Sequence, residues 1–223
     1  MTWYHGTPDI RDLRTAGRFT PRTEARRVIG DRSGLAKIME RMAAPGLSAA
    51  AAHAMSKEAD ACWETLDAPV PVFLSASRAT ATSYANDARA FDYQNAEPAV
   101  VAVDVGAAPD VTINAGGATF RGLTWGQIEA GLRASDLDSS VVSDMLFERL
   151  NGTQRDRIKV SDLGLALWSA GARVVEVTNV IDTHNGVGRP DTVRMVFDVD
   201  LIVIPEFAPA DADVVEASDA PGM

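Results

Sequence analysis

The sequence predicts an α+β domain in which one β-sheet joins segments that lie far apart in the chain. Short apolar runs typical of strands occur near both ends, and apolar residues with helical spacing dominate the middle. With 223 residues, of which 46% are hydrophobic and 23% charged, the chain is long enough to bury one sizeable core. We therefore expect a single domain over residues 1–205.

The N-terminal part is expected to form a strand, a tight turn and a short helix. Residues 2–5 are an aromatic stretch, and apolar spacing over residues 9–16 predicts a helix that stops at Gly17. Residues 23–66 hold two helical patterns separated by Pro45-Gly46. Their apolar members are Val28, Leu35, Ile38, Met39 and Met42 in the first pattern, and Leu47, Met55, Trp63 and Leu66 in the second.

The middle of the chain returns to strand patterns. A strand is expected at residues 72–75, and Ser77 is placed to cap a helix that continues to about Ala90. Residues 100–105 predict another strand, and the Gly-rich and Ala-rich residues 106–122 predict a loop.

The C-terminal part is expected to contain three helices followed by three strands. The expected helices are 126–133, 139–150 and 161–169, and the expected strands are 173–178, 192–197 and 201–204, with a polar loop over 182–190. Residues 206–223 contain five acidic residues and no basic one, so an acidic disordered tail is expected there.

The charge distribution bears on the class of partner. The net charge of −10 and the pI of about 4.7 argue against nonspecific binding to nucleic acids. Residues 1–41 nevertheless carry a net charge of +4, which is compatible with a local anion site there. Arg11, Arg14 and Arg18 recur at helical spacing, which fits either a solvated helix face or a site for phosphate groups.

The rest of the composition points to a cytoplasmic protein. The single cysteine, Cys62, cannot form an internal disulfide, which is typical of a reducing compartment. Neither a secretion signal nor a membrane-spanning segment is expected. The histidines His5, His53 and His184 are too scattered to predict a metal site, and no phosphate-binding Gly loop or Gly-x-Ser-x-Gly turn is present.

Two short motifs are candidates for chemistry. The first is Tyr4-His5-Gly6-Thr7 at the expected end of the first strand, where a glycine allows close approach of a ligand to the backbone. The second runs from Phe73 to Tyr84, eleven positions apart across a strand and the following helix. These two rings either belong to the core or flank one slot for a flat heteroaromatic ligand.

Together these motifs resemble the ADP-ribosyltransferase superfamily, in its diphtheria-toxin-like and poly(ADP-ribose)-polymerase-like branch. That branch opens with a Tyr/Phe-His-Gly-Ser/Thr strand and carries a second tyrosine at the same eleven-residue spacing. The segments Gly171–Asn179 and Met195–Asp198 are similar to its closing strands, particularly those of small phage and mobile-element domains. The resemblance implies the ADP-ribosyltransferase fold, a split mixed β-sheet core with helical insertions, here at about 23–66 as a lid or a target-recognition element.

The resemblance also implies roles for individual residues toward NAD, which would be a substrate, with no metal required. His5 would contact the adenosine ribose, the Gly6 backbone would hold the carboxamide, and Phe73 and Tyr84 would enclose the nicotinamide ring. Binding in a strained, oriented shape would expose the glycosidic carbon to a nucleophile. The full expected set is His5, Tyr84 and Glu176 for catalysis, and His5, Gly6, Thr7, Phe73, Ser75, Tyr84, Arg14 and Arg18 for NAD binding.

Two positions depart from the family pattern. Phe73 stands where a tyrosine is usual, which keeps the stacking and loses a hydroxyl. Val193 stands where the family has its catalytic glutamate, and a valine cannot stabilise the oxocarbenium-like transition state. Glu176 is a candidate replacement, and Asp191, expected in a loop, is another.

The expected function is therefore NAD-dependent mono-ADP-ribosylation of a macromolecular acceptor, protein rather than nucleic acid, with release of nicotinamide. A phage or mobile-element effector acting inside a bacterium is the setting that the resemblance implies. Val193 motivates one alternative, a catalytically inactive relative that binds NAD or a protein. A second alternative, an RNA 2′-phosphotransferase of the same fold, is disfavoured by the acidic composition.

Overall fold

The computed structural model describes residues 1–87, 96–149, 158–181 and 189–209. The chain divides into two compact units. The larger unit comprises Met1–Pro21 and Pro71–Met223, and the smaller unit comprises Arg22–Val70. The predicted insertion at 23–66 lies within the smaller unit. His184 and residues 210–223 lie outside the described residues.

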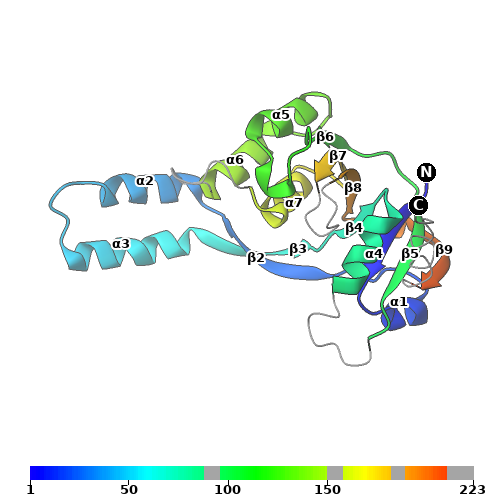
Figure 1. The fold of residues 1–223 in the computed structure, drawn as a ribbon. Coiled ribbons are helices and arrows are strands. Elements are labelled where there is room, and N and C mark those ends of the chain that lie inside the picture. The colour runs from blue at the N-terminus through cyan, green and yellow to red at the C-terminus, as the bar shows by residue number, and fades with distance from the viewer. Residues whose placement is uncertain (88–95, 150–157, 182–188, 210–223) are drawn as a thin grey trace, which may run out of the picture. The chain divides into compact units, whose positions relative to one another are not determined.

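The larger unit is built on a seven-stranded mixed sheet with the strand order β6-β7-β8-β4-β1-β5-β9 (Figure 1). The strands are β1 (Trp3–Thr7), β4 (Val72–Ser75), β5 (Ala99–Val105), β6 (Val111–Asn114), β7 (Val174–Ile181), β8 (Pro190–Val196) and β9 (Ile202–Pro209). Only β6 and β7 pair in parallel, and the other neighbours are antiparallel. The sheet therefore joins segments from both ends of the chain, as predicted for the α+β class.

The helices of the larger unit cover the sheet from both sides. They are α1 (Arg11–Ala16), α4 (Arg78–Asp87), α5 (Trp125–Arg133), α6 (Ser139–Arg149) and α7 (Val160–Ser169). α4 lies against β1 and β5, and α5, α6 and α7 gather at the β6–β8 end (Figure 1). A capping box between Thr124 and Gln127 fixes the start of α5, close to the predicted helix at 126–133.

Strand alternation divides the sheet into two faces. Tyr4 packs with Ala81 and Ala85 of α4, and its cross-strand partner Ser75 shares its face. We call this side the α4 face; it continues into the apolar core beneath α5, α6 and α7. The opposite side, which we call the α1 face, buries Trp3 and Leu74 against the residues of the α1 segment.

The sheet is weakly paired at one seam. β1 pairs with β5 at all five of its residues, whereas β1 and β4 share a single paired position, Tyr4 with Ser75. The neighbouring β4–β8 pair extends over four positions. The seam between β1 and β4 is therefore the most weakly paired one in this continuous sheet.

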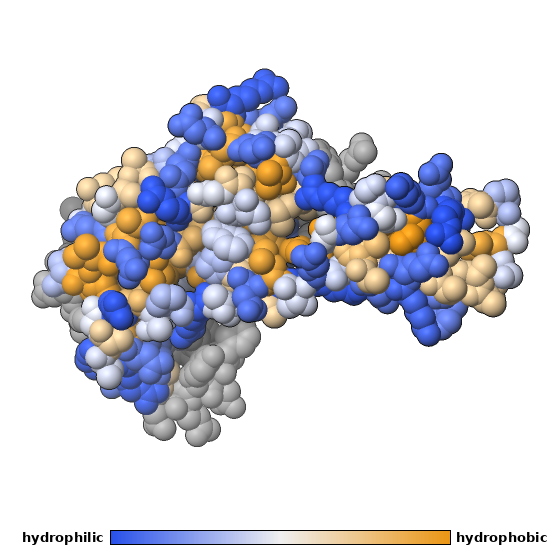
Figure 2. Space-filling view, turned by 180° about the vertical axis from the view of Figure 1, so that it is seen from behind, coloured by the Kyte–Doolittle hydropathy of each residue, from blue (hydrophilic) through white to orange (hydrophobic). Residues whose placement is uncertain are grey.

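The smaller unit combines a two-stranded antiparallel ribbon with a helical hairpin. The ribbon consists of β2 (Thr23–Ile29) and β3 (Trp63–Pro69), and the hairpin of α2 (Arg32–Met42) and α3 (Ala49–Ala61). Asp31 caps α2, and Ser48 caps α3. In the part of Figure 2 that holds this unit, on the right, hydrophilic and hydrophobic residues interleave over the visible face.

The ribbon corrects the helical prediction for both ends of the insertion. Val28 lies in β2, and Trp63 and Leu66 lie in β3, although their spacing suggested helices. All seven residues of β2 pair with β3, from Thr23 with Pro69 to Ile29 with Trp63. Backbone pairing between segments more than thirty residues apart therefore overrides a local apolar spacing that fits a helix by chance.

Two further elements differ from prediction. β6 lies inside the segment predicted as a loop, because Val111 and Ile113 are buried against α5 and pair with β7. β9 extends to Pro209 through pairing with β5, so 206–209 belong to the sheet and not to a disordered tail. The predicted stop of α1 is confirmed: the helix ends at Ala16 because Gly17 adopts φ 67°, and Arg18 lies outside the helix.

No helix in the described part of the chain is both long enough and apolar enough to cross a bilayer.

Candidate functional site

His5 spans the weakly paired seam between β1 and β4. Its Nδ1 lies 2.9 Å from the carbonyl oxygen of Phe73. Because a carbonyl oxygen can only accept a hydrogen bond, Nδ1 is the donor in this contact. The ring also meets Phe19 edge-on, with centroids 5.0 Å apart and planes at 86°. Strand alternation places the His5 side chain on the α1 face, so it approaches the seam from the side opposite Tyr4.

Phe73 and Tyr84 are exposed, so the interpretation of both rings as core residues is wrong. Phe73 retains 39% of its accessible surface and Tyr84 retains 36%, whereas Leu74 beside Phe73 is buried. Phe73 is two residues from Ser75 on β4 and so lies on the α4 face, and Tyr84 belongs to α4 itself. The structure therefore brings both rings to one side of the sheet and leaves them accessible there.

Gly6 is required by the packing of α4 on β1. A Cβ at this position would lie 1.9 Å from the carbonyl oxygen of Ala81 and 3.0 Å from the backbone nitrogen of Ala85. Only glycine allows this approach, which sets the distance of α4, and of Tyr84 on it, from β1. Gly6 pairs with Val100 of β5, and the pairing of β1 with β4 does not extend to it.

Thr7 organises the turn after β1. Its hydroxyl donates to the carbonyl oxygen of Asp9 at 2.8 Å and accepts from the Asp9 backbone N–H at 3.3 Å. This arrangement is a short-range turn motif of the kind that Ser and Thr form. The structure thus gives Thr7 a local role, separate from the exposed rings.

Ser75 joins β4, the start of α4 and β8. Its hydroxyl lies 2.5 Å from Oδ2 of Asp191 and 2.8 Å from the carbonyl oxygen of Ser77, and it accepts from the Ser77 backbone N–H at 2.9 Å. Ser77 also caps α4 as predicted, accepting from the N–H of Thr80. A carboxylate is therefore held against Ser75 on the α4 face, the side of the sheet that also carries the exposed rings.

Asp191 was expected in a loop, and the structure places it in β8. Its Oδ1 accepts from the backbone N–H of Thr192 at 2.7 Å, so both carboxylate oxygens have partners. Sequence reasoning missed this placement, although alternation of Asp191 with Val193 and Met195 would have put all three on one face.

Val193 is a core residue. It is 4% exposed, pairs with Ser75 on one side and Val177 on the other, and belongs to the cluster beneath α5, α6 and α7. No polar chemistry is available from this position.

Glu176 lies on the α1 face, in an ion pair. Arg194 Nε and one of its terminal nitrogens are both 2.9 Å from Glu176 Oε2, and the two side chains are only 13% and 17% exposed. The Arg194 guanidinium also lies 4.3 Å from the Trp3 ring centroid. Three strand spacings, about 14 Å, separate β7 from β1, so the structure does not bring Glu176 to the exposed rings.

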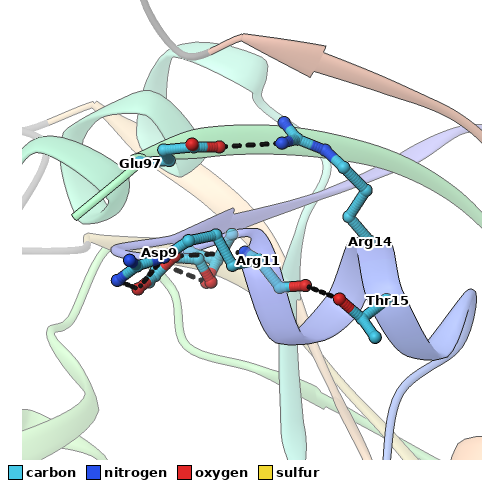
Figure 3. Close-up of polar contacts among 6 residues, drawn as sticks. Asp9, Arg11, Arg14, Thr15 and Glu97 are labelled. Carbon is cyan, nitrogen blue, oxygen red and sulfur yellow. Dashed lines mark hydrogen bonds and ion pairs between the residues drawn. The ribbon is translucent and has the colours of Figure 1, made fainter. Parts of the chain in front are cut away.

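The arginines near α1 lie beside carboxylates (Figure 3). Arg14 pairs with Glu97 at 2.8 Å, and Arg11 forms hydrogen bonds to both carboxylate oxygens of Asp9. The hydrogen bond from the Arg11 side chain, followed by that from its backbone, holds the pKa of Asp9 at about 2. Arg18 follows Gly17 outside the helix, so the three arginines do not form one helix face.

No family model, curated protein or solved structure matches this chain. The geometry of the exposed rings, the weakly paired seam and the Ser75–Asp191 contact is therefore the basis for assigning a function.

Proposed function

We propose that the chain is an NAD-dependent mono-ADP-ribosyltransferase that transfers one ADP-ribose to a macromolecular acceptor and releases nicotinamide. One observation carries the proposal: Phe73 and Tyr84 are exposed on the same side of the sheet. Large aromatic side chains are usually more buried than this, so two rings that each keep more than a third of their surface accessible on one side of the sheet favour a ligand site.

The exposed rings suit the nicotinamide end of NAD. The pyridinium ring is flat and positively charged, and aromatic faces attract such a cation as well as stacking on it. Each favourable cation–aromatic contact contributes about 0.5–2 kcal/mol. Phe73 retains this capacity without the hydroxyl of a tyrosine.

The seam between β1 and β4 is the second part of the proposed site, and His5 reaches it from the α1 face. In the neutral tautomer that donates from Nδ1, Nε2 is an acceptor, which is the role that a ribose hydroxyl requires. Gly6 lies next to His5 at the point where β1 no longer pairs with β4. A carboxamide needs backbone donors and acceptors of the kind that an unpaired strand edge supplies.

A protein acceptor is favoured over a nucleic acid. The net charge of −10 repels phosphate backbones. Arg11 and Arg14, the cations closest to His5 in sequence, each pair with a carboxylate. The same ion pairs weigh against an RNA 2′-phosphotransferase.

A specific observation favours one second candidate, an inactive relative that binds NAD without consuming it. Val193 is buried at the position where the resembling family has its glutamate. If no other carboxylate serves, binding would persist and turnover would be absent.

The experiment combines binding with turnover. Purified protein is titrated with NAD by calorimetry and incubated with NAD carrying label in the nicotinamide or in the adenosine, with and without bacterial lysate. We expect nicotinamide release and label transfer to protein, and loss of NAD affinity in Phe73→Ala and Tyr84→Ala.

Two control variants sharpen this experiment. Phe73→Tyr retains the stacking ring and should bind NAD as the unmodified protein does, and Val203→Ala removes an exposed apolar side chain from β9 and should change nothing. Binding without release would favour the inactive relative. Absence of binding would overturn both candidates.

A further inference from the structure

We propose that Asp191 is the carboxylate that contacts the ribose of NAD during transfer, and that Ser75 positions it. This inference rests on the proposed function and adds a catalytic residue to it. It starts from the 2.5 Å contact between Ser75 Oγ and Asp191 Oδ2.

The position of the contact relative to the exposed rings is the first support. Ser75 and Phe73 are two residues apart on β4, and their side chains share the α4 face. Two residues of strand span about 7 Å. The carboxylate that contacts Ser75 therefore lies on the same face as Phe73 and is displaced from it along β4, and we place the ribose there when its nicotinamide stacks on that ring.

The hydrogen bonding of Ser75 is the second support. Its single hydroxyl proton faces two acceptors, the Asp191 carboxylate and the Ser77 carbonyl oxygen, while the Ser77 N–H donates to its oxygen. Both contacts between this hydroxyl and Ser77 are with the Ser77 backbone, just before α4. Ser75 is also 5% exposed and paired on both sides, so its side chain is a rigid anchor for Asp191.

The electrostatic setting is the third support. Asp191 contacts Ser75, whose hydroxyl also contacts the Ser77 backbone just before the ten-residue helix α4, and the partial positive charge of a helix N-terminus favours an anion on this side. An ionised carboxylate offers about four lone-pair directions. Ser75 and the Thr192 N–H each use one, so the group retains capacity to accept a hydrogen bond from a ribose hydroxyl.

The other two positions considered for this role are unsuitable in the structure. Val193 has no polar atom and is buried. Glu176 faces the α1 side, where it accepts a hydrogen bond from Arg194 and forms an ion pair with it. Of these three positions, Asp191 alone presents a carboxylate on the face of the exposed rings.

The chemistry needs only a fixed negative charge near the glycosidic carbon. The bond between ribose C1′ and the nicotinamide nitrogen breaks, and its electron pair leaves with nicotinamide, which becomes neutral. Positive charge develops on the ribose, where Asp191 stabilises it. The acceptor nucleophile then forms a bond to C1′ and releases its proton to water, so NAD⁺ and the acceptor yield ADP-ribosylated acceptor, nicotinamide and H⁺.

The decisive variant is Asp191→Asn, which keeps the size of the side chain and removes its charge. Loss of one preorganised electrostatic group lowers kcat by about 100-fold or more. We expect that loss in nicotinamide release, with the NAD dissociation constant from calorimetry within about threefold of the unmodified value. Asp104→Asn, an exposed carboxylate on β5, is the matched control and should leave both quantities unchanged.

Ser75→Ala tests the positioning role. It should lower kcat less than Asp191→Asn, because the carboxylate remains but is held less firmly, and NAD affinity should again persist. Asp191→Glu keeps the charge and should retain more turnover than Asp191→Asn, a difference that a merely structural role of the hydrogen bond would not produce. Circular dichroism and thermal unfolding check that each variant folds.

The outcomes separate this inference from the proposed function. Turnover by the unmodified protein together with near-normal turnover in Asp191→Asn would overturn the role of Asp191 and leave the function standing. Equal loss in Asp191→Asn and Asp191→Glu would also overturn the charge-based role. Absence of NAD turnover in the unmodified protein would refute the proposed function, and this inference with it.

Discussion

Substituting Gly6 by alanine should separate α4 from β1. The added Cβ would lie 1.9 Å from the Ala81 carbonyl oxygen, where an ordinary contact needs at least 3.4 Å. Both nearby groups are backbone, so the overlap is relieved only by shifting the helix. Overpacking of this kind costs about 1–3 kcal/mol, and for a domain of this size each kcal/mol lowers Tm by about 2–4 °C.

Thermal unfolding and NAD titration together measure this effect. We expect Gly6→Ala to lower Tm by about 2–12 °C and to weaken NAD binding, because Tyr84 moves with α4. Gly126→Ala is the matched control: Gly126 lies in α5, and a Cβ added there would meet no atom within 4 Å, so the substitution should be neutral or slightly stabilising. An unchanged Tm in Gly6→Ala would refute the claim that this glycine sets the position of α4.

Two further predictions concern ion pairs. Arg194→Ala should lower the free energy of unfolding by about 3–5 kcal/mol in denaturant titrations, because it leaves Glu176 largely buried without its partner. Arg41→Ala, which removes an exposed ion pair of the smaller unit, should cost less than about 1 kcal/mol. Similar losses in both variants would contradict the claim that burial makes the Arg194–Glu176 pair the more important one. Because Arg11 holds the pKa of Asp9 at about 2, below its ordinary value of 3.8, ionised Asp9 stabilises the fold above about pH 4, and this contribution should be lost as the pH falls through 2. Thermal unfolding from about pH 5 to about pH 2 should therefore show a shallower decline in Asp9→Asn, and an identical decline would contradict the prediction.

Local sequence patterns were sufficient to predict the secondary structure of much of the larger unit. The cap at Ser77 and the apolar spacing before Gly17 predicted helices close to α4 and α1, because capping and left-handed stops depend on neighbouring residues. Local patterns also predicted strands close to β1 and β4, and the eleven-residue spacing from Phe73 to Tyr84 can be read directly from the sequence.

Features that depend on distant pairing were not predictable. The β2–β3 ribbon forms because two separated segments meet, and the helical spacing of Val28, Trp63 and Leu66 gave the wrong secondary structure. Burial of a ring likewise depends on the elements around it, so the sequence left open whether Phe73 and Tyr84 were core residues. The placement of Asp191 beside Ser75 requires the β4–β8 register, which joins positions 116 residues apart.

The most direct test of the central claim is nicotinamide release from NAD by the purified protein, measured with and without bacterial lysate beside the Tyr84→Ala variant. We predict release by the unmodified protein, stimulated by lysate and accompanied by transfer of adenosine label to protein, with both signals lost in Tyr84→Ala. Release that persists at full rate in a folded Tyr84→Ala would contradict the assignment of the exposed rings as the NAD site. No release from the unmodified protein under any condition would contradict the transferase function itself.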